Sequence, residues 1–156
     1  MRIAIVSDAW HPQVNGVVRT LSSVVGELRQ LGHIVEIIAV GDYPDLPLPS
    51  YPEIRLAFWF SGLSRRIQAF DPDAIHICTE GPIGFMVRRY CLKHGLSFTT
   101  SFHTRFPEYV HGRFPVSIDR GYSLMRRFHN PARNTLVPTP AVRHDLEMRG
   151  FKHLTV

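Results

Sequence analysis

The sequence predicts an α/β fold of the Rossmann-like type, an open parallel sheet flanked by helices. The first observation is residues 2–32, where the apolar run Ile3–Val6 precedes a polar loop and an amphipathic helix. The second is that short β-branched runs alternate with helical patterns along the rest of the chain. The third is a length of 156 residues with 44% hydrophobic content, which suits a single domain with its own core. Such alternation builds parallel β-α units with helices on both faces.

The elements of the first third follow from apolar spacing and from proline. Apolar residues recur every three or four positions from Leu21 to Leu31, which predicts a helix, and Gly32 suits the position after its end. The run Ile34–Val40 is a second strand pattern. Four prolines lie within Gly41–Pro52, and proline donates no backbone hydrogen bond. We therefore expect no regular structure in this connection.

Later elements are marked mainly by their ends. Pro82 suits the first position of a helix that runs to His94, and Gly95 suits the position after it. Thr139 suits the N-cap of the last helix, with Pro140 at its first position. The elements expected after residue 52 are a strand at 54–57, a helix at 58–70, a strand at 74–78, a helix at 83–94, a strand at 98–102, a loop at 103–116, a helix at 117–130, a strand at 135–137, a helix at 140–150 and a strand from 154.

Composition bounds the compartment and the partners. No apolar run reaches the ~18 residues of a membrane span, and the chain starts directly with a strand pattern, so we expect a cytoplasmic protein. Cys78 and Cys91 share no motif spacing, which favours reduced core residues. Residues 1–80 carry a net charge of −3 and residues 81–156 one of +8, with arginine as sixteen of the eighteen basic residues. This charge predicts an anionic partner, such as a phosphorylated metabolite, nucleotide, anionic lipid or nucleic acid, or simply a solvated basic face.

Ligands of open parallel sheets bind at the carboxyl ends of the strands, which here precede the loops 8–16, 79–82 and 103–115. In the first loop, Gly16 opens a helix whose free N–H groups and dipole would suit a phosphate. A turn glycine with positive φ is the equal alternative. In the second loop, Glu80 could accept hydrogen bonds from sugar hydroxyls or cap its own helix, and capping is favoured.

In the third loop, His103 follows a strand directly, and with Thr104 and Arg105 it could donate to hydroxyl or phosphate oxygens. That position weighs against a hydrogen-bonded core histidine, a description that fits His76 better. Tyr109, Phe106 and Phe114 could form an apolar or sugar-stacking wall, or could equally belong to the core.

Several common signatures are missing. The first turn has only one glycine in place of G-x-G-x-x-G, which argues against a nicotinamide cofactor, and neither a P-loop, G-x-S-x-G, H-E-x-x-H nor C-x-x-C is present. The nine histidines show no ligand spacing beside a carboxylate, so we expect no metal. The basic half has neither an aromatic-interleaved strand nor a recognition helix, so nucleic acid is not expected as a partner.

Four segments carry a resemblance to a known family. They are IAIVSDAWHPQVNGVVRTLSSVVGELRQLGHIVEIIA, TEGPIGFMVRRYC, SFHTRFPEYV and VPTPAVRHDLEMRGF, in this order. The chain resembles the N-terminal half of family-four glycosyltransferases of the GT-B fold, in particular the branch of bacterial mannosyltransferases and sulfoquinovosyl-lipid synthases. That fold has two Rossmann-like domains that face a cleft.

The resemblance implies that residues 1–156 form the acceptor-side domain, and that a C-terminal donor-binding domain would follow Val156. It implies retaining transfer from a nucleotide-sugar to a lipid, lipid-linked or glycan acceptor, without metal or other cofactor. The isolated domain is then expected to be inactive. The alternative is a non-catalytic ligand-binding or regulatory module that pairs with a separate donor-binding domain.

The resemblance also implies roles for particular residues. Gly16 would lie near the donor diphosphate, with Asn15 and Arg19 beside it, although many members have paired glycines where this chain has Asn15-Gly16. His103 would be the catalytic residue, in contact with the transferred sugar. The acceptor or sugar contacts would be Asp8, Trp10, Glu80, Thr104, Arg105 and Tyr109.

One helix suggests contact with the inner face of the cytoplasmic membrane. Basic and apolar residues alternate in the predicted helix 117–130, which could place the basic half on an anionic membrane surface. The residues concerned are Arg120, Leu124, Met125, Arg126, Arg127 and Phe128.

Overall fold

A computed structural model describes residues 1–48, 51–112 and 117–156. Its centre is a six-stranded sheet in the order β2-β1-β5-β6-β7-β8, and every neighbouring pair is parallel. The expected Rossmann-like open sheet is therefore confirmed. Its strands are β1 (Arg2–Ser7), β2 (Ile34–Ala39), β5 (Ala74–Ile77), β6 (Thr99–Ser101), β7 (Asn134–Leu136) and β8 (Leu154–Thr155).

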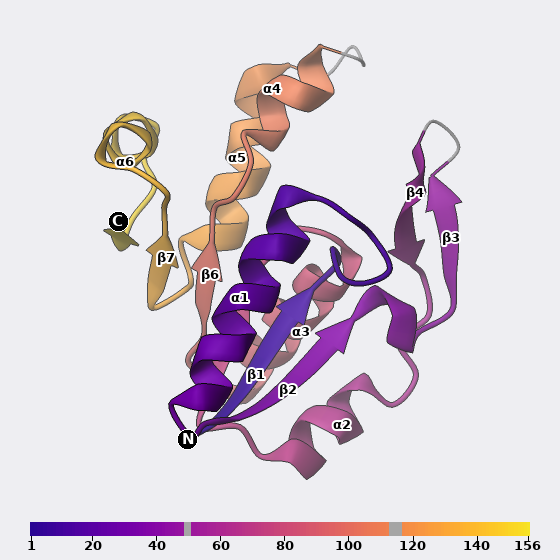
Figure 1. Ribbon diagram of the computed structural model, residues 1–156. Coiled ribbons are helices and arrows are strands. Elements are labelled where there is room, and N and C mark those ends of the chain that lie inside the picture. The colour runs from indigo at the N-terminus through magenta and orange to yellow at the C-terminus, as the bar shows by residue number, and fades with distance from the viewer. Residues whose placement is uncertain (49–50, 113–116) are drawn as a thin grey trace.

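Helices cover the sheet from both sides. Figure 1 shows α1 in front of the sheet and α3 behind it. Because β1 connects to β2 in one direction and the later strands follow in the other, right-handed crossovers place these helices on opposite faces. The helices are α1 (Gly16–Gln30), α2 (Leu63–Phe70), α3 (Pro82–His94), α4 (Phe106–His111), α5 (Ile118–His129) and α6 (Pro140–Met148), with a short 3₁₀ helix η1 (Val40–Asp42).

The side chains of β1 explain its continuous apolar sequence. Ile5 belongs to the cluster that packs under α1, with Ile3 against it, whereas Ala4 and Val6 belong to the larger cluster under α2, α3 and the end of α5. Alternate residues of a strand point to opposite faces, so a strand covered on both faces has to be apolar at every position.

The predicted helix ends are largely confirmed. The expected N-cap Thr139 accepts from the backbone N–H three residues later, and Pro82 and Pro140 stand at the first helical positions. Asn15 caps α1 in the same way, which was not predicted. Gly95 has a φ of +65°, which is the left-handed conformation that ends α3. These signals depend on local geometry alone, which is why the sequence predicts them well.

The proline-rich connection was wrongly expected to lack regular structure. It contains an antiparallel hairpin of β3 (Asp45–Leu48) and β4 (Tyr51–Ala57), which projects beside the main sheet in Figure 1. Each strand of a two-stranded ribbon has one edge without a partner, where proline is tolerated because no N–H is needed there.

Two helix predictions were also wrong in extent. The loop expected at 103–116 contains α4, which packs closely on α5: a Cβ at Gly121 would lie 2.8 Å from Cβ of Pro107. The helix expected at 58–70 begins only at Leu63, after Gly62, whose φ of +80° is not helical. The spacing of apolar residues shows neither the packing of α4 on α5 nor the turn at Gly62, so it could not predict these two helix boundaries.

The buried residues of α5 change the membrane interpretation. Met125 and Phe128 lie in the core, and only Leu124 of the three apolar residues expected at a membrane surface is exposed, at 47%. The membrane-facing stripe predicted on this helix is therefore wrong, because the apolar residues that define it pack inward. Cys78 and Cys91 are free and buried, as expected, and burial raises the pKa of the Cys78 thiol to about 12.

Candidate functional site

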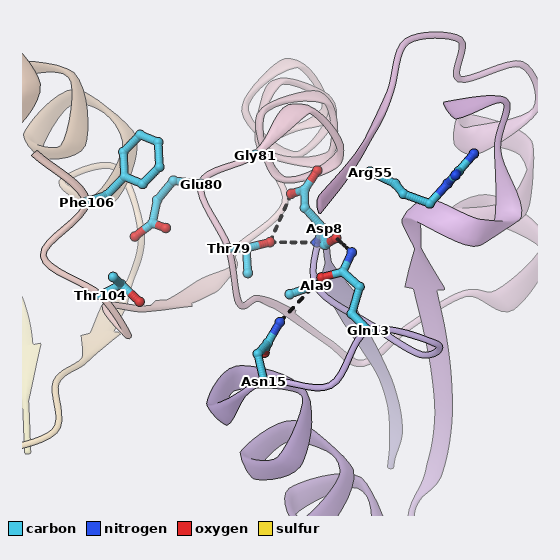
Figure 2. A pocket seen from close by; sticks show the side chains of 10 residues that line it. All are labelled: Asp8, Ala9, Gln13, Asn15, Arg55, Thr79, Glu80, Gly81, Thr104 and Phe106. Carbon is cyan, nitrogen blue, oxygen red and sulfur yellow. Dashed lines mark hydrogen bonds between the residues drawn. The ribbon is translucent and has the colours of Figure 1, made fainter. Parts of the chain in front are cut away.

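A cavity of about 330 Å³ opens where the strand order reverses between β1 and β5. All three predicted loops contribute to it, together with one residue of the β3–β4 hairpin. Their convergence at the carboxyl edge of the sheet is therefore confirmed, as the topology requires. The lining residues, drawn in Figure 2, are Asp8, Ala9, Gln13, Asn15, Arg55, Thr79, Glu80, Gly81, Thr104 and Phe106.

Asp8, in the first loop, lines the cavity and links this loop to the second loop and the start of α3. Its Oδ1 accepts from the N–H of Ile83 at 2.9 Å, and its Oδ2 accepts from the N–H of Gly84 at 3.3 Å and the hydroxyl of Thr79 at 2.9 Å. Burial raises the pKa of Asp8 above its ordinary 3.8, although these hydrogen bonds oppose the shift. Both oxygens thus already accept hydrogen bonds from the protein, and Asp8 serves as the cap of α3. A Cβ at Gly81 would lie only 2.3 Å from Cγ of Asp8, so this contact requires glycine.

The N-terminus of α1 is the more open of the two helix ends at this edge. Asn15 caps it through its Oδ1, which accepts from the N–H of Val18 at 3.0 Å, and the first turn has no acidic residue. Gly16 is helical, without the positive φ of a turn glycine, and a Cβ there would meet nothing within 4 Å. The turn-glycine interpretation of Gly16 is therefore wrong, and space for a ligand remains next to the start of α1.

Glu80 does not cap its own helix, contrary to expectation. The N-cap of α3 is Gly81, and Asp8 supplies the hydrogen bonds that a capping side chain would make. Glu80 instead accepts from Nε2 of His129 at 3.0 Å, and 14% of its side chain is exposed. Its carboxylate therefore belongs to the cavity wall.

His129 is a residue that the sequence interpretation overlooked. It is fully buried at the end of α5, and its Nδ1 is 2.9 Å from the hydroxyl of Thr100. A signal was available: Tyr122, Met125 and His129 are three and four positions apart, so the histidine continues the buried face of its helix.

His103 lines a second cavity, of about 270 Å³, between α1 and the ends of β6 and β7. Its Nε2 is buried without a hydrogen-bond partner in the described part of the chain. Burial lowers the pKa of His103, and the charge of Glu80 partly opposes this. His76, in contrast, bonds the hydroxyls of Thr99 and Ser101 through both ring nitrogens, which confirms it as a core histidine with its hydrogen bonds satisfied.

The other predicted residues are dispersed. Trp10 packs against the apolar cluster under α1, and the exposed Arg19 lines a separate hollow along that helix. Arg105 is engaged in ion pairs, one of them with Asp145 at 3.1 Å. The side chain of Tyr109 and the whole of Phe114 lie outside the described residues. Of the predicted site residues, the cavity brings together Asp8, Asn15, Glu80 and Thr104.

Three lining residues with side-chain functions were not singled out from the sequence. They are Gln13, Arg55 and Thr79. Phe106, expected either in a sugar-stacking wall or in the core, lines the cavity from α4. Arg55 reaches the cavity from the unexpected hairpin and could not be placed without knowledge of how that segment folds back over the sheet.

Comparison with known proteins assigns the family. The sequence profile of Glycosyltransferase Family 4 matches residues 14–156, which is most of the chain. The chain belongs to glycosyltransferase family 4. The match covers the second and third loops at the cavity but only residues 14–16 of the first, so Asp8, Ala9 and Gln13 lie outside it.

Several curated proteins are similar to this chain over much of its length. A GDP-mannose-dependent alpha-mannosyltransferase of Mycobacterium tuberculosis is 24% identical over 97% of the chain. An alpha-monoglucosyldiacylglycerol synthase of Streptococcus pneumoniae is 28% identical over 71% of it, and the sulfoquinovosyl transferase SQD2 of Arabidopsis thaliana is 30% identical over 67%. The chain spans less than half the length of these relatives: 45%, 28% and 21%, respectively.

Two features are absent from the part of the chain that the structure describes. None of the helices there is long and apolar enough to cross a membrane. The same part of the structure contains no group of three or more His, Cys, Asp or Glu residues that could hold a metal ion.

Proposed function

We propose that this family-four chain is the acceptor-binding half of a retaining, metal-independent glycosyltransferase. It would transfer a sugar from a nucleotide-sugar to a lipid, lipid-linked or glycan acceptor. The names of the relatives support the substrate classes, since one is a GDP-mannose-dependent mannosyltransferase and another a monoglucosyldiacylglycerol synthase. The second half of such an enzyme would hold the nucleotide-sugar from the other side of the cleft, with the donor diphosphate also near α1 of this chain. Alone, this chain would be inactive because positioning supplies much of the catalysis.

The observation that carries the proposal is the contrast between the two helix N-termini at the cavity. The N-terminus of α3 is neutralised by the buried carboxylate of Asp8. The first turn of α1 has no acidic side chain. In the described part of the chain, the N–H groups of Gly16 and Val17 have no acceptor to which they donate. A helix end with free N–H groups and a positive dipole end favours a phosphate, so we assign the donor diphosphate to α1.

His103 would contact the transferred sugar. Burial favours its neutral imidazole, which both donates and accepts hydrogen bonds, and its Nε2 is free of partners among the described residues. A neutral ring can therefore bind a sugar hydroxyl without placing a positive charge beside the reacting carbon. The free nitrogen supports a ligand contact, because a buried polar atom without a partner costs about 1–3 kcal/mol in the free protein.

The test is an assay of the longest polypeptide that the reading frame encodes, against a panel of nucleotide-sugars and lipid or glycan acceptors. We expect transfer without added metal, and NMR of the product should show the anomeric configuration of the donor. An inverted product would reject retention. Ligand binding by this polypeptide without any transfer would instead favour the alternative, a non-catalytic module.

A further inference from the structure

A chain of buried hydrogen bonds leads from the interior to the cavity. Glu80 Oε1 lies 3.0 Å from His129 Nε2, His129 Nδ1 lies 2.9 Å from the hydroxyl of Thr100, and that hydroxyl lies 2.8 Å from that of Thr135. The four residues come from the loop after β5, the end of α5, β6 and β7. His129, Thr100 and Thr135 are fully buried, and only Glu80 reaches the surface.

The direction of the bond to Glu80 follows from the chemistry of the groups. A carboxylate oxygen only accepts, so His129 Nε2 carries a proton and donates to it. In the neutral ring, Nδ1 accepts from Thr100, whose oxygen accepts from Thr135; in the charged ring, both threonine bonds reverse. In either charge state the Nε2–H of His129 donates to Glu80, and both ring nitrogens have a hydrogen-bond partner.

The ring of His129 has little freedom to move. It packs among three aromatic rings, with centroid distances of 5.0 Å to Phe128, 5.9 Å to Phe102 and 6.0 Å to Phe151. A fixed donor holds the carboxylate in one orientation, so a ligand that binds it does not have to order the side chain.

One carboxylate oxygen of Glu80 remains available to accept a hydrogen bond from a ligand in the cavity. Both oxygens of Asp8 accept hydrogen bonds from the protein, whereas Oε2 of Glu80 has no partner among the described residues. Figure 2 shows the Glu80 carboxylate on the same side of the cavity as Thr104 and Phe106. An acceptor oxygen, a hydroxyl and an aromatic ring together suit a sugar or another polyol.

We propose that Glu80 accepts a hydrogen bond from a hydroxyl of the acceptor substrate, and that His129 is the residue that positions Glu80 for this contact. This inference rests on the proposed function, because the ligand that carries the hydroxyl is identified with the acceptor substrate of the glycosyltransferase. His129 touches no ligand itself. It acts through the bond from Nε2 to the Glu80 carboxylate.

The test uses this chain and methyl α-D-mannopyranoside as the probe, with tetrahydropyran as the matched ring without hydroxyls. Binding is measured from ¹H–¹⁵N chemical shifts for wild type, Glu80→Gln, His129→Asn and His129→Gln. The amide of Gln reaches the place of Nε2 and can still donate to Glu80, whereas that of Asn reaches only the place of Nδ1. Circular dichroism melting confirms that each variant is folded at the temperature of measurement.

We expect Glu80→Gln and His129→Asn each to weaken binding of the probe by about tenfold or more, the effect of losing a hydrogen bond to a charged group. His129→Gln should stay within about threefold of wild type, and tetrahydropyran should not distinguish the variants. Equal weakening by His129→Asn and His129→Gln would overturn the positioning role. No binding of the probe by wild type, or full binding by Glu80→Gln, would overturn the contact.

A second measurement covers the case in which His129→Asn does not fold. In wild type, the Nε2 proton resonance of His129 should shift when the probe binds, because its acceptor Glu80 takes part in the contact. An unmoved resonance at saturation would overturn the proposal. Neither measurement requires transfer, so an inactive full-length polypeptide would reject the proposed function and leave these outcomes unaffected.

Discussion

Replacing Gly81 by alanine tests how the cavity is built. Gly81 has φ −87° and ψ −174°, an extended conformation that alanine adopts without strain. The added Cβ, however, would lie 2.3 Å from Cγ of Asp8 and 2.5 Å from its Oδ2. The carboxylate would have to move, and its hydrogen bonds with the N–H groups of Ile83 and Gly84 would be lost.

The expected cost follows from the bonds that would be lost. An N-cap contributes about 0.5–2 kcal/mol, and buried N–H groups left without an acceptor cost about 1–3 kcal/mol. We therefore expect Gly81→Ala to lower the free energy of unfolding by about 2–4 kcal/mol, a large part of the roughly 5–15 kcal/mol of a typical domain. Gly26→Ala is the matched control, because Gly26 lies inside α1 with open space around its Cβ position. That control should raise the free energy of unfolding by about 0.5–1 kcal/mol.

Urea unfolding followed by circular dichroism measures both changes. Within an Asp8→Ala background, Gly81→Ala should cost little more, because the atoms it would clash with are gone. If Gly81→Ala unfolds at the same urea concentration as wild type, or costs as much without the Asp8 side chain, the account of this contact is refuted.

The remaining predictions concern pH, the α1 cap and the proposed reaction. Burial, with a smaller contribution from His103, lowers the pKa of His76 from 6.5 to about 4, so the unfolded chain takes up this proton first as pH falls. The free energy of unfolding should then decrease by up to about 3 kcal/mol between pH 6.5 and 4, and a His76→Gln variant measured by urea unfolding should lack this part of the slope. Asn15→Ala should lower stability by about 1 kcal/mol in the same assay, and an unchanged midpoint would contradict the cap. In the full-length polypeptide, Gly16→Val should raise the KM for the nucleotide-sugar by about tenfold or more, because the side chain occupies the space assigned to phosphate; an unaltered KM would remove the donor from α1. His103→Ala should reduce kcat by about a hundredfold or more with the melting temperature retained, and unchanged turnover would reject its assigned role.

Features that depend on neighbours in the sequence could be predicted. Pro82 and Gly95 bracket α3, and Thr139 caps α6, because each of these signals acts within one helical turn. The apolar run of β1 indicated a strand covered on both faces, and the convergence of three loops followed from parallel topology alone. The strand order, which only the structure gives, then located the cavity at the reversal between β1 and β5.

Features that depend on distant partners could not be predicted. Glu80 resembles a helix cap in the sequence, but Asp8, which is 72 positions away, takes that place. His129 resembles the end of an amphipathic helix, and only the packing of α5 against β6 brings it to Thr100 and Glu80. The hairpin adds Arg55 to the cavity through long-range contacts that no local pattern encodes.

The sequence by itself determined the α/β class, most element boundaries and the edge of the sheet at which a site would form. Local propensity, capping and apolar period are sufficient for these, because each acts over a few residues. Only the tertiary structure decided which polar groups are already engaged and which remain free for a ligand. That distinction depends on hydrogen bonds between residues far apart in the chain. Within the described part of the structure, they occupy both oxygens of Asp8 and leave one oxygen of Glu80 and the start of α1 open.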